Sequence, residues 1–282
     1  MSDNIYTYDS VNFHKTFVPE EVYITKILEL AEKKFSGTKE QISDITGIPT
    51  GKTSGKVIPH IKYAYYMGLI NYQFEKSVFI LSLTSFGETV LNQDKYLFED
   101  ITKLICHFNI CDKDKGAYIW SFIYFKQSLM FEVKMSLDLL KKKCCDLFLI
   151  DADVSPLKRA YRNDGFWGKL GIFDTQCLAD KSGELCLNSL FYNDVFKFAY
   201  AYTLFSAWDI YMKDTGEITT DQVVDILMWN KRLGFDEDEM LFVLEELEAE
   251  GLVRLNKQLA PYTVIRNAET NDILPRLYEL LS

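Results

Sequence analysis

The order of sequence patterns in the first part of the chain constrains its fold most strongly. Residues 22–34 repeat apolar side chains at the i, i+3, i+4 and i+7 positions, which predicts an amphipathic helix. Thr38 and Gln41 have the spacing of a capping box, so they predict the start of a short second helix that stops at Gly47 and Pro49.

The residues that follow continue this order. Residues 50–70 predict a third helix, and residues 70–84 alternate enough to predict a hairpin that turns at Glu75 and Lys76 before a helix resumes. Helix, short helix, helix and hairpin is the order of a winged helix-turn-helix domain. We therefore predict such a domain over residues 1–93.

The charge of the third predicted helix indicates what this domain binds. The chain has 31 Lys and Arg against 41 Asp and Glu, a net charge of −10, so a nucleic acid needs a local basic patch. No acidic residue occurs between Asp44 and Glu75. The alternative, that the helix only packs and its lysines are solvated, stays open. The residues predicted to contact phosphates or base edges of duplex DNA are Lys52, Thr53, Lys56, His60 and Lys62.

Residues 47–53 look like a phosphate-binding Walker A loop. That motif needs four residues between its glycines, whereas three separate Gly47 from Gly51. The motif also follows a buried strand, but the residues before Gly47 are polar and have a helical pattern. We therefore predict no nucleotide site here.

Residues 94–149 predict a helical connecting region that is rich in aromatic residues. The aromatic residues within 120–125 fit a helix-bundle core better than a platform for stacked bases. The lysines at 141–143 follow a predicted helical stretch, and we interpret them as its solvated end. The alternative is that they contact phosphates.

Residues 150–192 repeat the winged pattern less clearly. Ser155, as a cap, and Pro156 predict a helix start, and residues 171–188 predict two strands around residues 181–183. The alternative is a purely structural subdomain. The basic residues of this segment that we predict as a second DNA contact are Lys158, Arg159 and Arg162.

Residues 193–282 predict a third winged-helix-like unit. A long aromatic helix comes first, and a later helix runs into a hairpin. Between Asp236 and Glu250 there are eight acidic residues and no basic one, a charge that opposes contact with DNA phosphates. We therefore expect this unit to pack or to dock a protein partner.

Catalytic and metal-binding motifs are sparse. The six cysteines form no CxxC pair and the three histidines are scattered, so no zinc finger is predicted and the cysteines are interpreted as reduced thiols. No GxSxG or HExxH motif occurs, so no catalytic residue, cofactor or metal site is predicted, although separated acidic residues can still assemble a metal nuclease in space.

The N-terminus lacks a secretion signal and the apolar segment 195–212 contains two charges. We therefore expect a cytoplasmic protein without a membrane span.

Several short motifs follow one another in a fixed order along the chain. They are Phe13 to Phe17, Gly51-Lys52 through Gly68-Leu69-Ile70, Leu83 to Gly87, Tyr96 to Asp100, Ser155 to Arg159, and Phe198 to Trp208. In this order the chain resembles the bacterial domain-of-unknown-function family 4007 over essentially its whole length. It departs from the family at Lys15, where the family has an acidic residue, and at residues 18–20, which replace a usual arginine.

The resemblance implies a role in phage-defence operons, in particular in DNA phosphorothioation. Members of this family accompany a cysteine desulfurase, an ATPase and a sulfur transferase similar to PAPS reductases, and some are thought to nick DNA. We therefore expect a DNA-binding accessory protein of such a system, with double-stranded DNA and these proteins as partners. The alternatives are a DNA nickase, which alone requires Mg²⁺ or Mn²⁺, and a protein adaptor for the sulfur-transfer machinery.

The patterns together predict a mainly α fold of the α+β type. It consists of multiple winged helix-turn-helix units with small β-hairpin wings, joined by the aromatic-rich helical region. The predicted divisions are residues 1–93, 94–149, 150–192 and 193–282.

Overall fold

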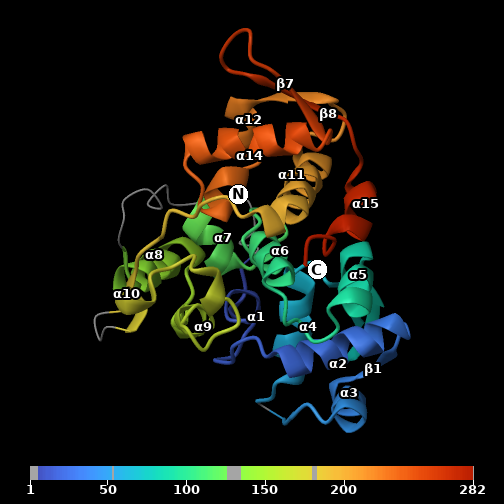
Figure 1. The fold of residues 1–282 in the computed structure, drawn as a ribbon. Helices are drawn as coiled ribbons and strands as arrows, with labels where there is room; N and C mark the ends of the chain where they lie inside the picture. The colour runs from blue at the N-terminus through green and yellow to red at the C-terminus, as the bar shows by residue number, and fades with distance from the viewer. Residues whose placement is uncertain (1–5, 53, 126–134, 180–182, 282) are drawn as a thin grey trace. The chain divides into compact units, whose positions relative to one another are not determined.

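The computed structural model describes residues 6–52, 54–125, 135–179 and 183–281. The chain forms two compact units, Met1–Leu187 and Asn188–Ser282, drawn in Figure 1. Helices dominate both units, and the sheets are small and antiparallel. The prediction of a mixed, mainly helical fold class is therefore confirmed.

The first unit contains, in chain order, α1 (Tyr8–Val11), α2 (Glu21–Glu32), β1 (Ser36–Thr38), α3 (Lys39–Thr46), α4 (Val57–Tyr66), β2 (Ile70–Glu75), β3 (Val78–Leu83), α5 (Ser85–Gln93), α6 (Asp100–Ile110), α7 (Tyr118–Phe125), β4 (Met135–Ser136), α8 (Leu137–Phe148), α9 (Ser155–Ala160), the 3₁₀ helix η2 (Gly168–Leu170), α10 (Thr175–Ala179) and β5 (Glu184–Leu185).

The predicted start and end of α3 are confirmed by its capping contacts. Thr38 Oγ1 accepts the backbone N–H of Gln41 at 3.3 Å, and Gln41 Oε1 accepts that of Thr38 at 2.8 Å. Gly47 ends the helix in the left-handed conformation, with φ of 70°. The predicted hairpin is also present as β2 and β3, and β1 adds a third strand in the order β1-β3-β2.

The third predicted helix is shorter than expected because residues 50–52 and 54–56 are not helical, so that α4 begins only at Val57. Its end is a Schellman motif, in which the N–H of Leu69 donates to the carbonyl of Ala64 at 2.9 Å. Gly68 adopts the positive φ, 75°, that this motif requires.

Helix α5 packs against the backbone where β2 begins. A Cβ atom on Gly87 would lie 1.8 Å from the carbonyl oxygen of Leu69, so only glycine fits at this position. This close approach brings α5 into contact with the backbone at the start of β2.

The aromatic residues of the connecting region lie in the core, as predicted. Trp120 and Phe122 are each 1% exposed, and Tyr124 is 3% exposed. The lysines at 141–143 are predicted to follow a helical stretch, but the structure places them within α8.

The predicted pair of strands over residues 171–188 is wrong. Residues 175–179 form the helix α10, and β5 pairs instead with β4, Glu184 opposite Ser136. A single bridge, Phe173 to Leu187, is what remains of the expected pairing among the described residues. Asp174 caps α10, since its carboxylate accepts the N–H of Gln176 at 2.7 Å, and this favours a helix over a strand.

The second unit contains, in chain order, the 3₁₀ helix η3 (Asp194–Phe196), α11 (Lys197–Tyr211), β6 (Glu217–Thr219), α12 (Thr220–Asp225), α13 (Trp229–Leu233), α14 (Glu237–Ala249), β7 (Val253–Asn256), β8 (Thr263–Arg266), α15 (Thr270–Ile273) and the 3₁₀ helix η4 (Leu274–Arg276).

The second unit repeats the local design of the first. Thr219 and Gln222 form a capping box for α12, just as Thr38 and Gln41 do for α3. Helix α14 ends at Gly251 with φ of 73°, and the N–H of Leu252 donates to the carbonyl of Leu247 at 3.0 Å, a second Schellman motif. The sheet order is β6-β8-β7, which matches β1-β3-β2.

The long aromatic helix predicted at the start of this unit is α11, and the acidic helix is α14, which runs into the hairpin β7–β8. Across the described residues of the whole chain, none of the helices is both long and apolar enough to cross a membrane.

Candidate nucleic-acid interface

The loop between α3 and α4 closes tightly on itself. The N–H of Lys56 donates to the carbonyl of Pro49 at 2.7 Å, which joins the two ends of the loop. A Cβ atom on Gly51 would lie 2.7 Å from the carbonyl oxygen of Ser54, and one on Gly55 would lie 2.7 Å from the Cα of Thr50. Both glycines therefore allow a backbone crossing that larger residues would obstruct.

Lys52 lies in this loop and is exposed. Thr53, also predicted to contact DNA, lies outside the described residues. The loop leads directly into α4, whose first peptide groups carry the partial positive charge of a helix N-terminus. Exposed cation, glycine-containing loop and helix N-terminus together make a surface suited to an anionic group.

Lys56, the N-cap residue of α4, already has an anionic partner. Its Nζ lies 2.7 Å from Glu20 Oε1 and 5.0 Å from the centre of the Tyr23 ring, and the side chain is 25% exposed. Lys56 therefore ties α4 to the start of α2, and its charge is largely compensated within the protein.

The structure places His60 in the core, which corrects its prediction as a surface contact. Its side chain is fully buried. The ring Nε2 accepts the backbone N–H of Glu20 at 3.2 Å, so Nδ1 carries the proton and donates to the carbonyl of Lys56 at 2.7 Å. Burial lowers the pKa of His60, so the ring is neutral at pH 7 and has no surface to offer a duplex.

Lys62 is half-buried, and its Nζ donates to the carbonyl of Asp9 at 2.8 Å. Burial lowers the pKa of this lysine. Across α4, six of ten residues are buried and the other four are half-buried, so none is exposed within the described part of the chain. The side chains of this helix therefore mainly pack against the protein, but Lys56 and Lys62 bond within it and are not the solvated lysines of the alternative interpretation.

The second basic segment is also partly tied to the protein. Helix α9 begins at Ser155, but Val154 and not Ser155 is its N-cap, and Arg162 lies beyond its end. Lys158 is half-buried, whereas Arg159 and Arg162 are exposed. Two contacts of the arginines are from Arg159 to the carbonyl oxygen of Thr16 and from Arg162 Nε to Asp164 Oδ1, the latter at 3.7 Å.

Both basic segments meet the same N-terminal element, residues 9–17. Lys62 binds the carbonyl at one end of this element and Arg159 a carbonyl near the other. Asn12 adds two hydrogen bonds, because its side-chain amide donates to the carbonyl of Asp151 at 2.9 Å and accepts the backbone N–H of Asp153 at 2.8 Å. The N-terminal element therefore joins α4 to residues 151–159, a connection that sequence reasoning missed.

His14 lies at the centre of this element and is fully buried. Its Nδ1 accepts the N–H of Thr16 at 3.4 Å, while Nε2 has no hydrogen-bond partner among the described residues. Burial lowers the pKa of His14 to about 4. The negative charge of Asp153 acts to raise this pKa, whereas the positive charge of Arg159 acts to lower it. Lys15 and Thr16 adopt positive φ values of 45° and 73°, which are uncommon outside glycine.

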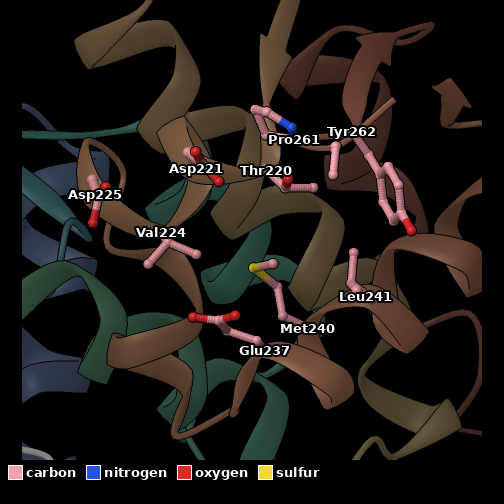
Figure 2. Close-up of a pocket in the computed structure, with 10 residues that line it drawn as sticks. Thr220, Asp221, Val224, Asp225, Glu237, Met240, Leu241, Pro261 and Tyr262 are labelled. Carbon is pink, nitrogen blue, oxygen red and sulfur yellow. The ribbon is translucent and has the colours of Figure 1, made fainter. Parts of the chain in front are cut away.

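The second unit contains a pocket of about 570 Å³ between α12, the N-terminal part of α14 and the loop before β8. Figure 2 shows the carboxylates of Asp221, Asp225 and Glu237 toward one side of it and Leu241 and Tyr262 toward the other. A pocket with anionic and apolar sides matches a lysine or arginine side chain, which has an apolar stem and a cationic head.

Two solved structures are similar to this chain in fold. A magnesium-ion-bound crystal structure of SspB matches with a TM-score of 0.75 at 14% sequence identity, covering 98% of this chain and 90% of that one. A further SspB crystal structure matches with a TM-score of 0.73 at 13% identity and the same coverage. No protein-family model matches the sequence, and neither does any curated protein.

Proposed function

We propose that this chain is a DNA-binding accessory protein of a bacterial DNA-modification defence system of the phosphorothioation type. The observation that carries the proposal is the exposed Lys52 in the loop that contains Gly51 and Gly55 and leads into the N-terminus of α4. Further support comes from the element order over residues 21–83, helix, strand, helix, helix and hairpin, which fits a winged helix-turn-helix. The second unit follows the same order with one more helix, α13, between α12 and α14. The similarity to SspB in fold and the resemblance to family 4007 point to the same class of system.

The geometry favours contact with the DNA backbone over base reading by α4. No residue of α4 is exposed in the described part of the chain, so its side chains do not project as a recognition helix requires. Exposed cations of the first unit include Lys52 in the loop, Lys76 at the turn of the β2–β3 hairpin, and Arg159 and Arg162 near α9. Contacts of this kind position a protein on DNA without specifying a sequence.

Replacement of Lys52 by alanine tests this proposal. We expect K52A to weaken binding to a fluorescent duplex of any sequence and to reduce the slope of log K against log salt by about 0.9, the value for one lost phosphate contact. Lys213→Ala is the matched control, since Lys213 is an exposed lysine in the second unit and the change in net charge is the same. An unchanged salt slope for K52A, or an equal reduction for both variants, contradicts the proposal.

A metal-dependent nickase is the second candidate, favoured by the magnesium ion in one of the SspB structures. Supercoiled plasmid incubated with the protein and Mg²⁺ or Mn²⁺ separates the candidates. Relaxation that EDTA abolishes supports the nickase, whereas binding with intact supercoils supports the accessory protein.

The second unit, which contains the acidic helix α14, provides the surface proposed for protein partners. These partners are the sulfur transferase similar to PAPS reductases, the cysteine desulfurase or the ATPase. The pocket lined by Asp221, Asp225 and Glu237 supports a lysine or arginine of the partner as the group bound. Neutralising all three carboxylates as Asn, Asn and Gln is expected to abolish co-purification with the partner while leaving DNA binding intact. Retention of the partner by this triple variant contradicts the assignment.

A further inference from the structure

Cys177, Glu184 and Cys186 come together in the last part of the first unit. Their ligand atoms, two sulfurs and a carboxylate oxygen, all lie within 4.8 Å of one another. Cys177 and Glu184 are half-buried and Cys186 is buried. Sequence spacing did not reveal this group, because nine positions separate the two cysteines and no CxxC pair is present.

The backbone holds these three side chains in register. Glu184 and Cys186 are two positions apart at β5, so they project to the same side of an extended segment. The N–H of Asp174 donates to the carbonyl of Cys186 at 2.8 Å, and the Asp174 carboxylate accepts the N–H of Cys177 at 3.4 Å. Asp174 thus connects the two cysteine-bearing segments, through its backbone N–H to one and its carboxylate to the other, independently of any ion.

We propose that Cys177, Glu184 and Cys186 bind one Zn²⁺ ion. Zinc takes thiolate ligands at about 2.3 Å and carboxylate oxygens at about 2.0 to 2.2 Å in a tetrahedron, which places the ligand atoms about 3.5 to 3.8 Å apart. The observed grouping needs only a closure of about 1 Å to reach this geometry, within the reach of side-chain rotation. A water molecule fills the fourth position.

The chemistry of the ligands selects zinc over magnesium. Two thiolates are soft donors that suit Zn²⁺, whereas Mg²⁺ and Mn²⁺ prefer oxygen ligands. The site is therefore distinct from the Mg²⁺ or Mn²⁺ centre that the nickase alternative requires. Binding releases the two thiol protons to solvent, so affinity rises with pH.

The bound ion would fasten α10 to β5. These elements have five and two residues, and β5 pairs with a strand of only two residues, so hydrogen-bonded secondary structure by itself gives this segment little support. Because a metal that binds the folded state stabilises it by mass action, zinc removal is expected to loosen this segment.

The test uses the full chain, purified under reducing conditions, stripped of metal and titrated with Zn²⁺ against a chromogenic chelator. We expect one zinc per chain. Co²⁺ in place of Zn²⁺ is expected to give a thiolate-to-cobalt charge-transfer band, which reports sulfur ligation directly. Cys177→Ser should weaken zinc binding by about 100-fold and, at saturating Co²⁺, reduce the band to about half, because Cys186 remains as one thiolate ligand. Glu184→Gln should weaken binding by about tenfold with the full band retained.

Cys145→Ser is the matched control, because Cys145 is also a half-buried cysteine but lies outside the group. This variant should keep one zinc per chain and the full band. Far-UV circular dichroism checks that each variant is folded, and E184Q, which leaves both thiols in place, tests the site if C177S fails to fold. Three results would overturn the proposal. They are wild-type protein without stoichiometric zinc, a cobalt band in C177S that is as strong as in the wild type, and a mass loss of two hydrogens from a Cys177–Cys186 disulfide in the purified reduced protein.

Discussion

Replacing His14 with asparagine is expected to remove a large part of the pH dependence of stability in the first unit. His14 is fully buried and its pKa lies at about 4, against 6.5 for an exposed histidine. Between these two values the unfolded chain binds a proton that the folded chain excludes. Stability is therefore complete above pH 6.5 and is lost as the pH falls toward 4. Burial lowers the pKa of His60 too, so that residue contributes with the same sign.

The magnitude follows from the two pKa values. A difference of one in pKa corresponds to about 1.4 kcal/mol, so His14 accounts for at most about 3.4 kcal/mol of lost stability once the pH is well below 4. At pH 5 the same linkage gives about 2 kcal/mol relative to pH 7.5. This is a large fraction of the stability of an ordinary domain.

Asparagine keeps an acceptor near the position of Nδ1, where His14 accepts the N–H of Thr16, but it does not titrate. Urea unfolding at pH 7.5 and pH 5 gives the loss of free energy for wild type and H14N. The wild type should lose about 2 kcal/mol more than the variant. NMR titration of the three histidine Cε1–H resonances measures the pKa directly, and H14N identifies the His14 signal by its absence. A His14 signal that titrates above pH 6, or equal losses in both proteins, refutes the reasoning.

Two further predictions concern local packing and capping. Gly87→Ala should destabilise the first unit by about 3 kcal/mol or more in urea unfolding, because the added Cβ would lie 1.8 Å from the backbone carbonyl of Leu69. Gly216→Ala, where a Cβ meets nothing within 4 Å, should change stability by less than about 0.5 kcal/mol, and similar losses for both would contradict this explanation. Thr38→Ala should cost about 1 kcal/mol by removing the capping box of α3, whereas Thr38→Ser should stay close to wild type in the same assay.

Sequence reasoning succeeded where the information was local. The capping box at Thr38 and Gln41 and the helix end at Gly47 depend on residues within nine positions of one another. The structure contains both the capping box and the helix end. The two strands predicted over residues 171–188 failed because the cap at Asp174 starts a helix and because β5 pairs with β4, a strand about fifty residues earlier.

The candidate DNA contacts show the same limit. Counting charge identified Lys52, which is exposed, but could not tell it from Lys56 and His60, which are both bound by Glu20 at the start of α2. The zinc ligands escaped prediction for a related reason, since a short helix and a strand bring them together and no spacing motif marks them.

The sequence by itself determined the capped start of α3, the hairpins β2–β3 and β7–β8 and the location of the acidic charge, because helix caps, turns and apolar periodicity act between residues close in the chain. The tertiary structure decided which charges are available. Lys62 meets a carbonyl 53 positions away and Arg159 one 143 positions away, and in both cases the N-terminal element takes up donors that the sequence presents as free. Whether a cation faces solvent or another part of the protein is a property of packing between distant segments, and no local pattern encodes it.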